Sequence, residues 1–153
     1  MRARDLAVEY PAVTPDDSAL DAAWLLAEHR FPGLIVVDAA RRPVAVLPGA
    51  LLLRDVMPAY VRDDPNLARV YGERNADRLC GTLAGRRVGD LLAHGERVLP
   101  VVDADANVME IASVMAESGS PVVAVCEAGG GPMLGAIAVA HLLTRLLPER
   151  GAP

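Results

Sequence analysis

The sequence predicts an α/β fold made of two similar halves that pack about an approximate twofold axis. Three observations support it: an internal repeat, a capped amphipathic helix in each copy, and a short apolar strand after each helix. Residues 14–38 and 103–127 align without a gap, 89 positions apart (105 minus 16), with identical pairs at Asp16/Asp105, Ala23/Ala112, Ala27/Ala116, Glu28/Glu117, Pro32/Pro121 and Val36/Val125. Such a repeat indicates two copies of one supersecondary unit.

Each copy opens with a short segment that contains the pair Asp-Leu. Residues 2–7 carry this pair in the first copy, and residues 88–92 echo it in the second. A short strand is expected next, at residues 12–13 and again at residues 99–102. The two copies therefore begin with the same order of elements.

The main helix of each copy has a clear start signal. Ser18 and Asn107 are predicted N-caps, because an acidic residue stands three positions after each of them. One face of the first helix is apolar, and neighbouring leucines widen that face: Leu20, Ala23, Trp24 and Ala27, with Leu25 and Leu26. An apolar face of this width predicts a helix packed on two neighbours.

A strand, a turn, a return strand and a closing helix follow each main helix. Residues 34–37 form a continuous apolar run, which is typical of a strand buried on both faces. Return strands are expected at residues 44–47 and 133–137, and closing helices at residues 50–56 and 139–147. The three glycines at 129–131 lack the Gly-Lys-Ser/Thr ending of a phosphate loop, so a hairpin turn is expected there.

An insertion separates the two copies. Asp64-Pro65 is a good helix start, and an interrupted apolar stripe follows it, weakened at Gly72. We expect a connector packed on its own domain, although a surface for a partner is the alternative. The predicted organisation is a first repeat at residues 1–57, an inserted helical linker at 58–86, a second repeat at 87–147 and a tail at 148–153, together forming one compact pair.

Composition limits the classes of function. The chain has 153 residues, of which 52% are hydrophobic, and a net charge of −5, so it can fill one core and lacks the basic face of a nucleic-acid-binding protein. Cys80 and Cys126 show no CxxC spacing, and Cys126 lies in an apolar strand, which favours a reduced core cysteine. No signal peptide or membrane-spanning stretch is visible. We expect a cytoplasmic protein without direct membrane insertion.

The order of elements identifies a candidate family. Its Asp-Leu segment, the Thr-Pro-Asp-Asp entry to the helix at residues 14–17 and the Val-Val-Asp exit at residues 36–38 together resemble a CBS domain, and the tandem resembles a CBS pair, or Bateman module. The resemblance covers about residues 2–57 and 87–147. It implies βαββα repeats packed with pseudo-twofold symmetry, a cleft that commonly binds adenine nucleotides or related ligands, frequent dimerisation, and a regulatory rather than catalytic role.

The resemblance also implies which residues contact a ligand. They enter the main helix, begin the buried exit strand, or belong to a motif of Gly, two apolar residues, Thr or Ser, two residues and Asp. In this sequence the first two groups are Thr14, Pro15, Asp16 and Asp103, then Gly33, Leu34, Val122 and Val123. Pro48 and Ala138 stand where the motif has its hydroxyl, and Leu51 and His141 stand where it has Asp.

These replacements change the expected ligand. A leucine accepts no hydrogen bond from a ribose, and a proline lacks even its backbone donor. We therefore expect weak or absent binding of AMP and ATP, and a site in the second half that involves His141 for any small ligand, S-adenosylmethionine included. His141 can donate to a phosphate or carry a pH-dependent charge. The alternative is a histidine at the solvent edge of a helix.

Three hypotheses of function remain. The first is a regulatory CBS pair that senses a small ligand, such as an adenine nucleotide or an anion, in its cleft and modulates a partner. The second is a ligand-free dimerisation or docking subunit for a transporter or an enzyme. The third is an enzyme, but the sequence shows no catalytic constellation, and its three dispersed histidines predict no metal site. For the first two we expect a homodimer.

Overall fold

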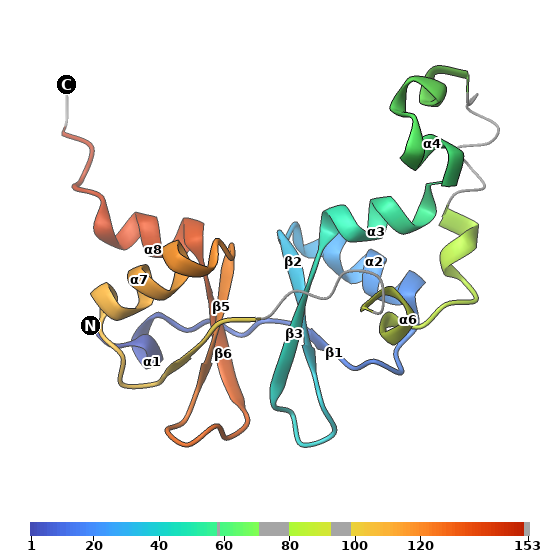
Figure 1. Cartoon of the computed structure of the whole chain (residues 1–153). Coiled ribbons are helices and arrows are strands. Elements are labelled where there is room, and N and C mark those ends of the chain that lie inside the picture. The colour runs from blue at the N-terminus through green and yellow to red at the C-terminus, as the bar shows by residue number, and fades with distance from the viewer. Residues whose placement is uncertain (58, 71–79, 93–98, 152–153) are drawn as a thin grey trace.

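The computed structural model describes residues 1–57, 59–70, 80–92 and 99–151. Two three-stranded sheets stand side by side in it, in the orders β1-β2-β3 and β4-β5-β6, and the helices lie on their outer sides (Figure 1). The strands are β1 (Ala12–Val13), β2 (Gly33–Val37), β3 (Pro43–Pro48), β4 (Val101–Asp103), β5 (Val122–Cys126) and β6 (Met133–Ala138). The mixed α/β fold of two similar halves is therefore confirmed.

The helices follow the predicted order in both halves. The first half contains α2 (Ala19–His29) and α3 (Gly49–Val56), and the second half contains α7 (Val108–Ser118) and α8 (Val139–Leu146). Two shorter helices, α1 (Ala3–Leu6) and α6 (Val88–Leu92), are the Asp-Leu segments. From here on, the first half means the sheet β1–β3 with its helices, and the second half means the sheet β4–β6 with its helices.

The two sheets share their register as well as their topology. In each sheet the first strand runs parallel to the second, and the second runs antiparallel to the third. Both sheets have an irregularity at the same place, between Val36 and Val37 and between Val125 and Cys126. All five residues of β2 and of β5 are buried, as the apolar runs predict.

The N-caps of the main helices are Ser18 and Asn107, as predicted, but they differ in their hydrogen bonds. The Ser18 hydroxyl accepts a hydrogen bond from the Asp21 N–H at 3.4 Å. Asn107 Oδ1 accepts from the Glu110 N–H at 3.0 Å, and Glu110 Oε2 accepts from the Asn107 N–H at 2.7 Å. The reciprocal capping box is thus complete in the second half.

Three clusters of buried side chains form the core, and they follow the layers of the fold. One cluster lies between the first sheet and its helices, and one lies between the second sheet and its helices. The third lies between the two sheets, where Ile35, Val46, Val122 and Ala136 meet. Because both faces of each central strand are covered, alternation of polar and apolar residues is absent from β2 and β5.

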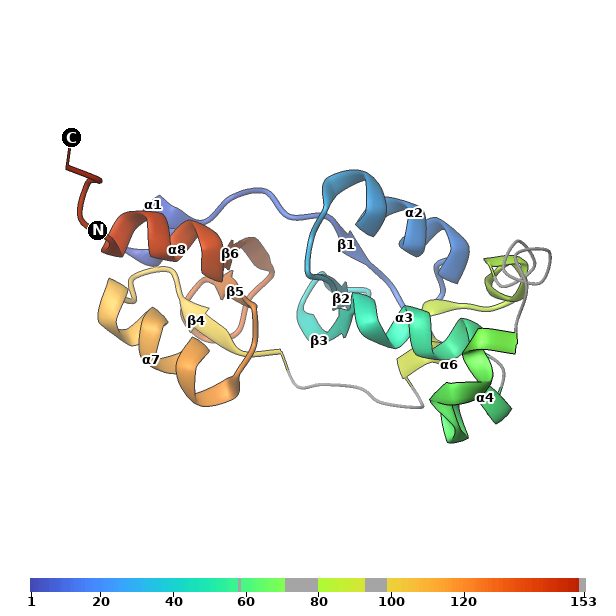
Figure 2. The ribbon, with the colours of Figure 1, turned by 90° about the horizontal axis from the view of Figure 1, so that it is seen from above.

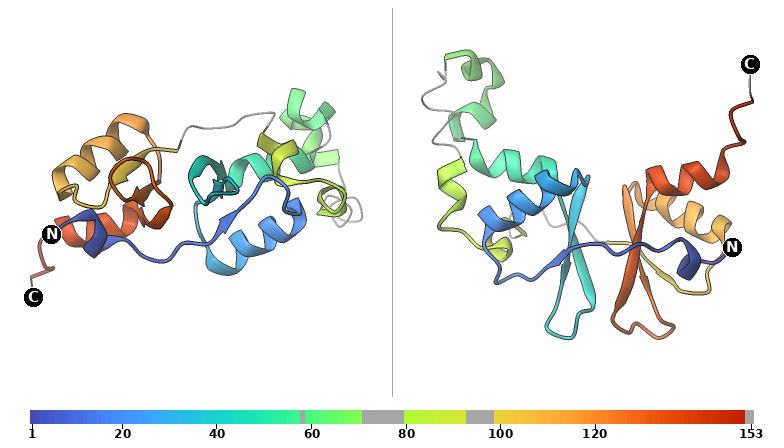
Figure 3. Two further views of the ribbon diagram at one scale, coloured as in Figure 1. Left: turned by 90° about the horizontal axis from the view of Figure 1, so that it is seen from below. Right: turned by 180° about the vertical axis from the view of Figure 1, so that it is seen from behind.

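The N-terminal segment crosses from one half to the other (Figures 2 and 3). Helix α1 packs on the second half, where the Ala3 N–H donates to the Ala106 carbonyl at 2.8 Å and the Leu6 side chain is 1% exposed. The chain then pairs Val8 with Ala136 before it enters β1 of the first half. The segment that was expected to open the first repeat therefore completes the second half.

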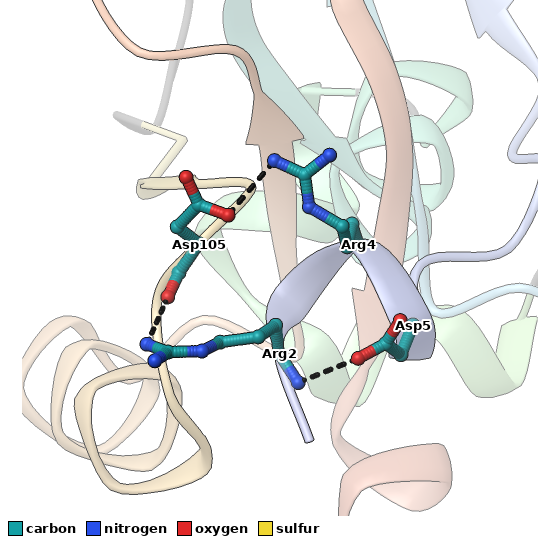
Figure 4. A network of polar contacts seen from close by, with 4 residues as sticks. All are labelled: Arg2, Arg4, Asp5 and Asp105. Carbon is teal, nitrogen blue, oxygen red and sulfur yellow. Dashed lines mark hydrogen bonds and ion pairs between the residues drawn. The ribbon is translucent and has the colours of Figure 1, made fainter.

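Figure 4 shows the polar contacts that hold this segment in place. Arg4 forms an ion pair with Asp105 at 2.8 Å, and the Arg2 side chain donates to the Asp105 carbonyl at 2.7 Å. The Arg2 N–H donates to Asp5 at 2.9 Å, which closes the first turn of α1. All three of these polar contacts are exposed to solvent. The burial of Ala3 and Leu6 therefore supplies most of the free energy that attaches α1 to the second half.

Helix α6 makes the reciprocal crossing. It packs on the first half, where the Val88 N–H donates to the Asp17 carbonyl at 2.9 Å and the Gly89 N–H donates to the Pro15 carbonyl at 2.8 Å. Leu91, the counterpart of Leu6, is 1% exposed in the first-half core. Each half is thus completed by a segment that precedes the other half in the sequence.

The insertion is more divided than the sequence indicated. It contains α4 (Ala59–Asp63), a 3-10 helix η1 (Pro65–Val70) and a second 3-10 helix η2 (Cys80–Leu83). The predicted start at Asp64-Pro65 is present, because Asp64 Oδ1 accepts from the Asn66 N–H at 3.1 Å, but α4 was not foreseen. The expected break at Gly72 lies outside the described residues. Leu83 is buried in the first-half core, so this end of the insertion packs on its own domain.

Two further expectations concern single features. Cys126 is a free, buried cysteine at the end of β5, and burial together with the nearby Asp103 carboxylate raises the pKa of its thiol. Among the described residues, no helix is long and apolar enough to cross a membrane.

Candidate ligand site

Some of the candidate ligand residues of each half lie together where the second strand begins and the third strand ends. Gly33 pairs with Pro48, and Val122 pairs with Ala138 at the same place in the other sheet. The closing helices start at once, so Leu51 and His141 lie in the first turns of α3 and α8. We call Gly33, Pro48 and Leu51 the first-half site, and Val122, Ala138 and His141 the second-half site.

Leu34 and Val123 follow Gly33 and Val122 on the same strands. Both side chains are fully buried in the clusters beneath the helices, away from the space between the sheets. Only the backbone of these two residues is available to a ligand at the sites just defined.

The helix-entry residues lie at the opposite end of the sheet. Because β1 runs parallel to β2, with Val13 beside Val36, Thr14 lies beyond the position of Val36. Gly33 is three residues earlier on β2, roughly 10 Å away along the strand. The structure therefore does not bring Thr14, Pro15 and Asp16 together with Gly33.

The helix-entry residues have other contacts at that end. The Pro15 carbonyl accepts from Gly89, and the Asp16 carboxylate lies 3.6 Å from Arg87, both on the α6 side. Asp103 is in the same situation in the second half, because its register partner is Cys126 at the far end of β5. These contacts tie the helix entries to the crossing segments.

The same parallel register identifies two residues that the sequence analysis missed. Tyr10 precedes β1 and Leu99 precedes β4, so both lie beside the starts of β2 and β5. The Tyr10 hydroxyl donates a buried hydrogen bond to the Gly33 carbonyl at 2.6 Å. Burial raises the pKa of Tyr10 to about 12. A parallel pairing of the first two strands, inferred from the strand-helix-strand order, could have pointed to both positions.

The two sites differ in chemistry. Leu51 is half-buried against the first-half core and accepts no hydrogen bond, whereas His141 is half-buried and offers a titratable ring. Helices α3 and α8 both lack a side-chain cap, because their N-caps are Pro48 and Ala138, and in α8 the Val139 N–H donates to the Pro121 carbonyl at 2.9 Å. The remaining N–H groups of the first turn, next to an imidazole, suit an anion.

Other kinds of site have no support in the part of the chain that the structure describes. No group of three or more His, Cys, Asp or Glu side chains is placed to hold a metal ion there. The core of the described residues contains no buried charged side chain.

Comparisons with known proteins agree with this architecture. The family model of the CBS domain matches residues 3–62. A CBS domain-containing protein of unknown function from Kribbella flavida is 41% identical, with a TM-score of 0.86, and the match covers 97% of this chain and 99% of that one. A search of the curated proteins found no match.

More distant solved structures share the fold alone. The CBS-pair protein CBSX2 from Arabidopsis thaliana is 22% identical with a TM-score of 0.70, over 99% of this chain and 98% of that one, and CBSX2 has also been solved in complex with AMP. The CBS domain of a bacterial CNNM/CorC family Mg2+ transporter in complex with ATP is 15% identical with a TM-score of 0.62, covering 95% of this chain and 87% of that one. CBS domains are generally regulatory rather than catalytic. On the evidence of the tandem sheets and the relative from Kribbella flavida, the chain belongs to the CBS-domain family.

Proposed function

We propose that this protein is a cytoplasmic regulatory CBS pair, without catalytic activity of its own, which senses a small anionic ligand in its second-half site and modulates a partner. The observation that carries this proposal is the contrast between His141 and Leu51. At equivalent positions the second half keeps a polar, titratable side chain beside an uncapped helix N-terminus, and the first half has an apolar one. We propose residues 1–57 and 87–147 as its two repeats.

AMP and ATP are the reference ligands, because CBSX2 and the CNNM/CorC domain have been solved with them. Neither site of this chain has the carboxylate that would accept hydrogen bonds from both ribose hydroxyls, because Leu51 and His141 stand at that position. Each polar group buried without a partner costs about 1–3 kcal/mol. Weak or absent binding of AMP and ATP is therefore expected, and a small anion or S-adenosylmethionine remains a candidate for the second-half site.

Calorimetry and thermal shift with AMP, ATP, S-adenosylmethionine and inorganic phosphate test this proposal. A ligand present at 100 times its dissociation constant adds about 2.7 kcal/mol of stability, which is readily observed. His141→Ala should abolish the response, and Arg145→Ala, which removes an exposed side chain later on the same helix, should retain it. Ligand binding that is unchanged in His141→Ala would show that the ligand does not bind at the second-half site.

The second candidate function is a ligand-free dimerisation or docking subunit for a transporter or an enzyme. The exposed apolar side chains of the outer helices favour it: Trp24 is 61% exposed on α2, Leu53 is 68% exposed on α3, and Met109 is 73% exposed on α7. Trp24 also lines an apolar groove with Leu20, Ala23, Ala27 and Leu83. Helices with such faces are expected to pack on a second copy of the chain.

Light scattering tests the homodimer. The native protein should have a dimer mass, and Trp24→Arg or Met109→Arg should shift it toward the monomer without unfolding either half. A monomer mass for the native chain over a wide range of concentration would remove the dimer from both proposed functions.

A further inference from the structure

The first half contains a stack of aromatic rings that the second half lacks. The Tyr10 and Phe31 rings are stacked with their centroids 4.3 Å apart and their planes 22° apart. The His29 ring extends the stack, with its centroid 5.3 Å from that of Phe31. Phe31 is the only phenylalanine of the chain, and aromatic residues make up 3% of the sequence, so ring stacking is not the usual way in which this core is filled.

This stack lies against the first-half site. Tyr10 is 4% exposed and belongs to the cluster between the two sheets, with Phe31 packed on its edge. The Tyr10 hydroxyl donates to the Gly33 carbonyl at 2.6 Å, and Gly33 is the register partner of Pro48. The Tyr10 hydroxyl therefore satisfies the carbonyl at the start of β2, and the Tyr10 and Phe31 rings pack beside it.

The second half has small or aliphatic side chains at the equivalent positions. With the offset of the repeat, Leu99 replaces Tyr10, Ser120 replaces Phe31 and Ser118 replaces His29. The Ser120 hydroxyl donates to the Val122 carbonyl at 2.6 Å, so the acceptor equivalent to that of Gly33 is also satisfied from within the chain. The same backbone acceptor is thus satisfied by the hydroxyl of a large aromatic side chain in one half and by the hydroxyl of a small serine in the other.

A planar heteroaromatic ligand with an N–H donor would need the same features that Tyr10 uses. It would need a surface on which its ring can stack, and the space at the start of β2 that the Tyr10 and Phe31 rings fill. We infer that the Tyr10–Phe31 pair is a built-in occupant of the first-half site, which excludes such a ligand from that half and restricts each chain to a single ligand, in the second half. That each chain binds a single ligand rests on the proposed function, whereas the exclusion of such a ligand from the first half does not.

Two combined variants distinguish two reasons why the first half would not bind AMP: the space filled by the Tyr10 and Phe31 rings, and the polar groups that are missing at positions 48 and 51. Pro48→Thr with Leu51→Asp supplies the hydroxyl and carboxylate that the first half lacks while the stack stays intact. Adding Tyr10→Leu and Phe31→Ser then replaces the stacked pair by the residues that the second half has at these two positions, Leu99 and Ser120. AMP is the probe, titrated by calorimetry, with the fold checked by circular dichroism.

The expected result is a difference in stoichiometry. The double variant with the intact stack should bind as many AMP molecules per chain as the native protein, and the quadruple variant should bind one more. An additional AMP in the double variant, or none in a folded quadruple variant, would overturn the inference. Since the readout is a gained first-half site, native protein that binds nothing would contradict the proposed function and still leave this test decisive.

A second measurement covers a quadruple variant that does not fold. Tyr10→Ala removes the ring, and 4-methylphenol has the shape and the hydroxyl of the lost side chain. At millimolar concentration it should raise the Tm of Tyr10→Ala by about 3 °C and leave Leu99→Ala and the native protein unchanged. An equal shift in all three proteins, or no shift in Tyr10→Ala, would show that the ring does not occupy a site for a separate molecule.

Discussion

The two halves of this molecule have the same backbone and use it differently. Their strands agree in order, register, burial and irregularity. They differ at the start of the central strand, where the first half has the buried Tyr10 and the second has Leu99 with the smaller Ser120. They differ again in the first turn of the closing helix, where the first half has Leu51 and the second half has His141. The fold thus constrains the strands strictly and leaves the chemistry of each site free to diverge.

The largest test of this comparison concerns the exchanged segments. Leu6→Ala and Leu91→Ala each remove a fully buried side chain, so each should lower the free energy of unfolding by about 2–5 kcal/mol. Hydrogen exchange should locate the loss of Leu6 in the second half, around α7 and β5, and the loss of Leu91 in the first half, around α2 and β2. Faster exchange around β2 in Leu6→Ala, with β5 unaffected, would contradict the crossing.

A glycine on β6 offers a smaller and more local test. A Cβ at Gly135 would lie 2.7 Å from the Val8 carbonyl oxygen, a backbone atom that cannot move alone. Gly135→Ala should therefore displace the N-terminal segment and cost about 1–3 kcal/mol, as overpacking does. The matched control is Gly131→Ala, where the nearest atom is 3.8 Å away, and the first half already tolerates a Cβ at Ala45, the equivalent position. Equal Tm values for the two variants would show that the segment is not held against β6.

Much of the fold was predictable because it depends on local pattern. The caps at Ser18 and Asn107 and the apolar strands are encoded by residues close together in the sequence. The crossing of α1 was not predictable, because the Asp-Leu segments of the two copies are nearly interchangeable and nothing local states which sheet each one covers. Tyr10 was missed for a related reason: its contact with Gly33 depends on the parallel register of β1 and β2, which only the folded chain shows.

The Tyr10 hydroxyl allows a direct comparison of the two covered carbonyls. Tyr10→Phe leaves the buried Gly33 carbonyl without its partner and should cost about 1–2 kcal/mol, whereas Ser120→Ala, at a part-buried bond, should cost less. The pKa of Tyr10 is raised from 10.0 to about 12, so the folded state holds this proton more tightly than the unfolded state does. The corresponding stability is complete below pH 10 and is lost as the pH rises toward 12. Denaturant titrations across this range should show that the free energy of unfolding falls more steeply with pH for the native protein than for Tyr10→Phe. Equal slopes would show that Tyr10 does not cause the alkaline loss of stability.

The smallest expected effect belongs to the ion pairs that accompany the two crossings. Arg4 lies 2.8 Å from Asp105 in the second half, and Arg87 lies 3.6 Å from Asp16 in the first, with all four side chains largely exposed. Exposed pairs of this kind contribute about 0–1 kcal/mol, because water screens the charges and two long side chains must be ordered. Arg4→Ala should therefore cost slightly more than Arg87→Ala, and the difference should shrink in 1 M salt, where the screening length falls to about 3 Å. A loss as large as that of Leu6→Ala would mean that charge, rather than the burial of Ala3 and Leu6, attaches the N-terminal helix to the second half.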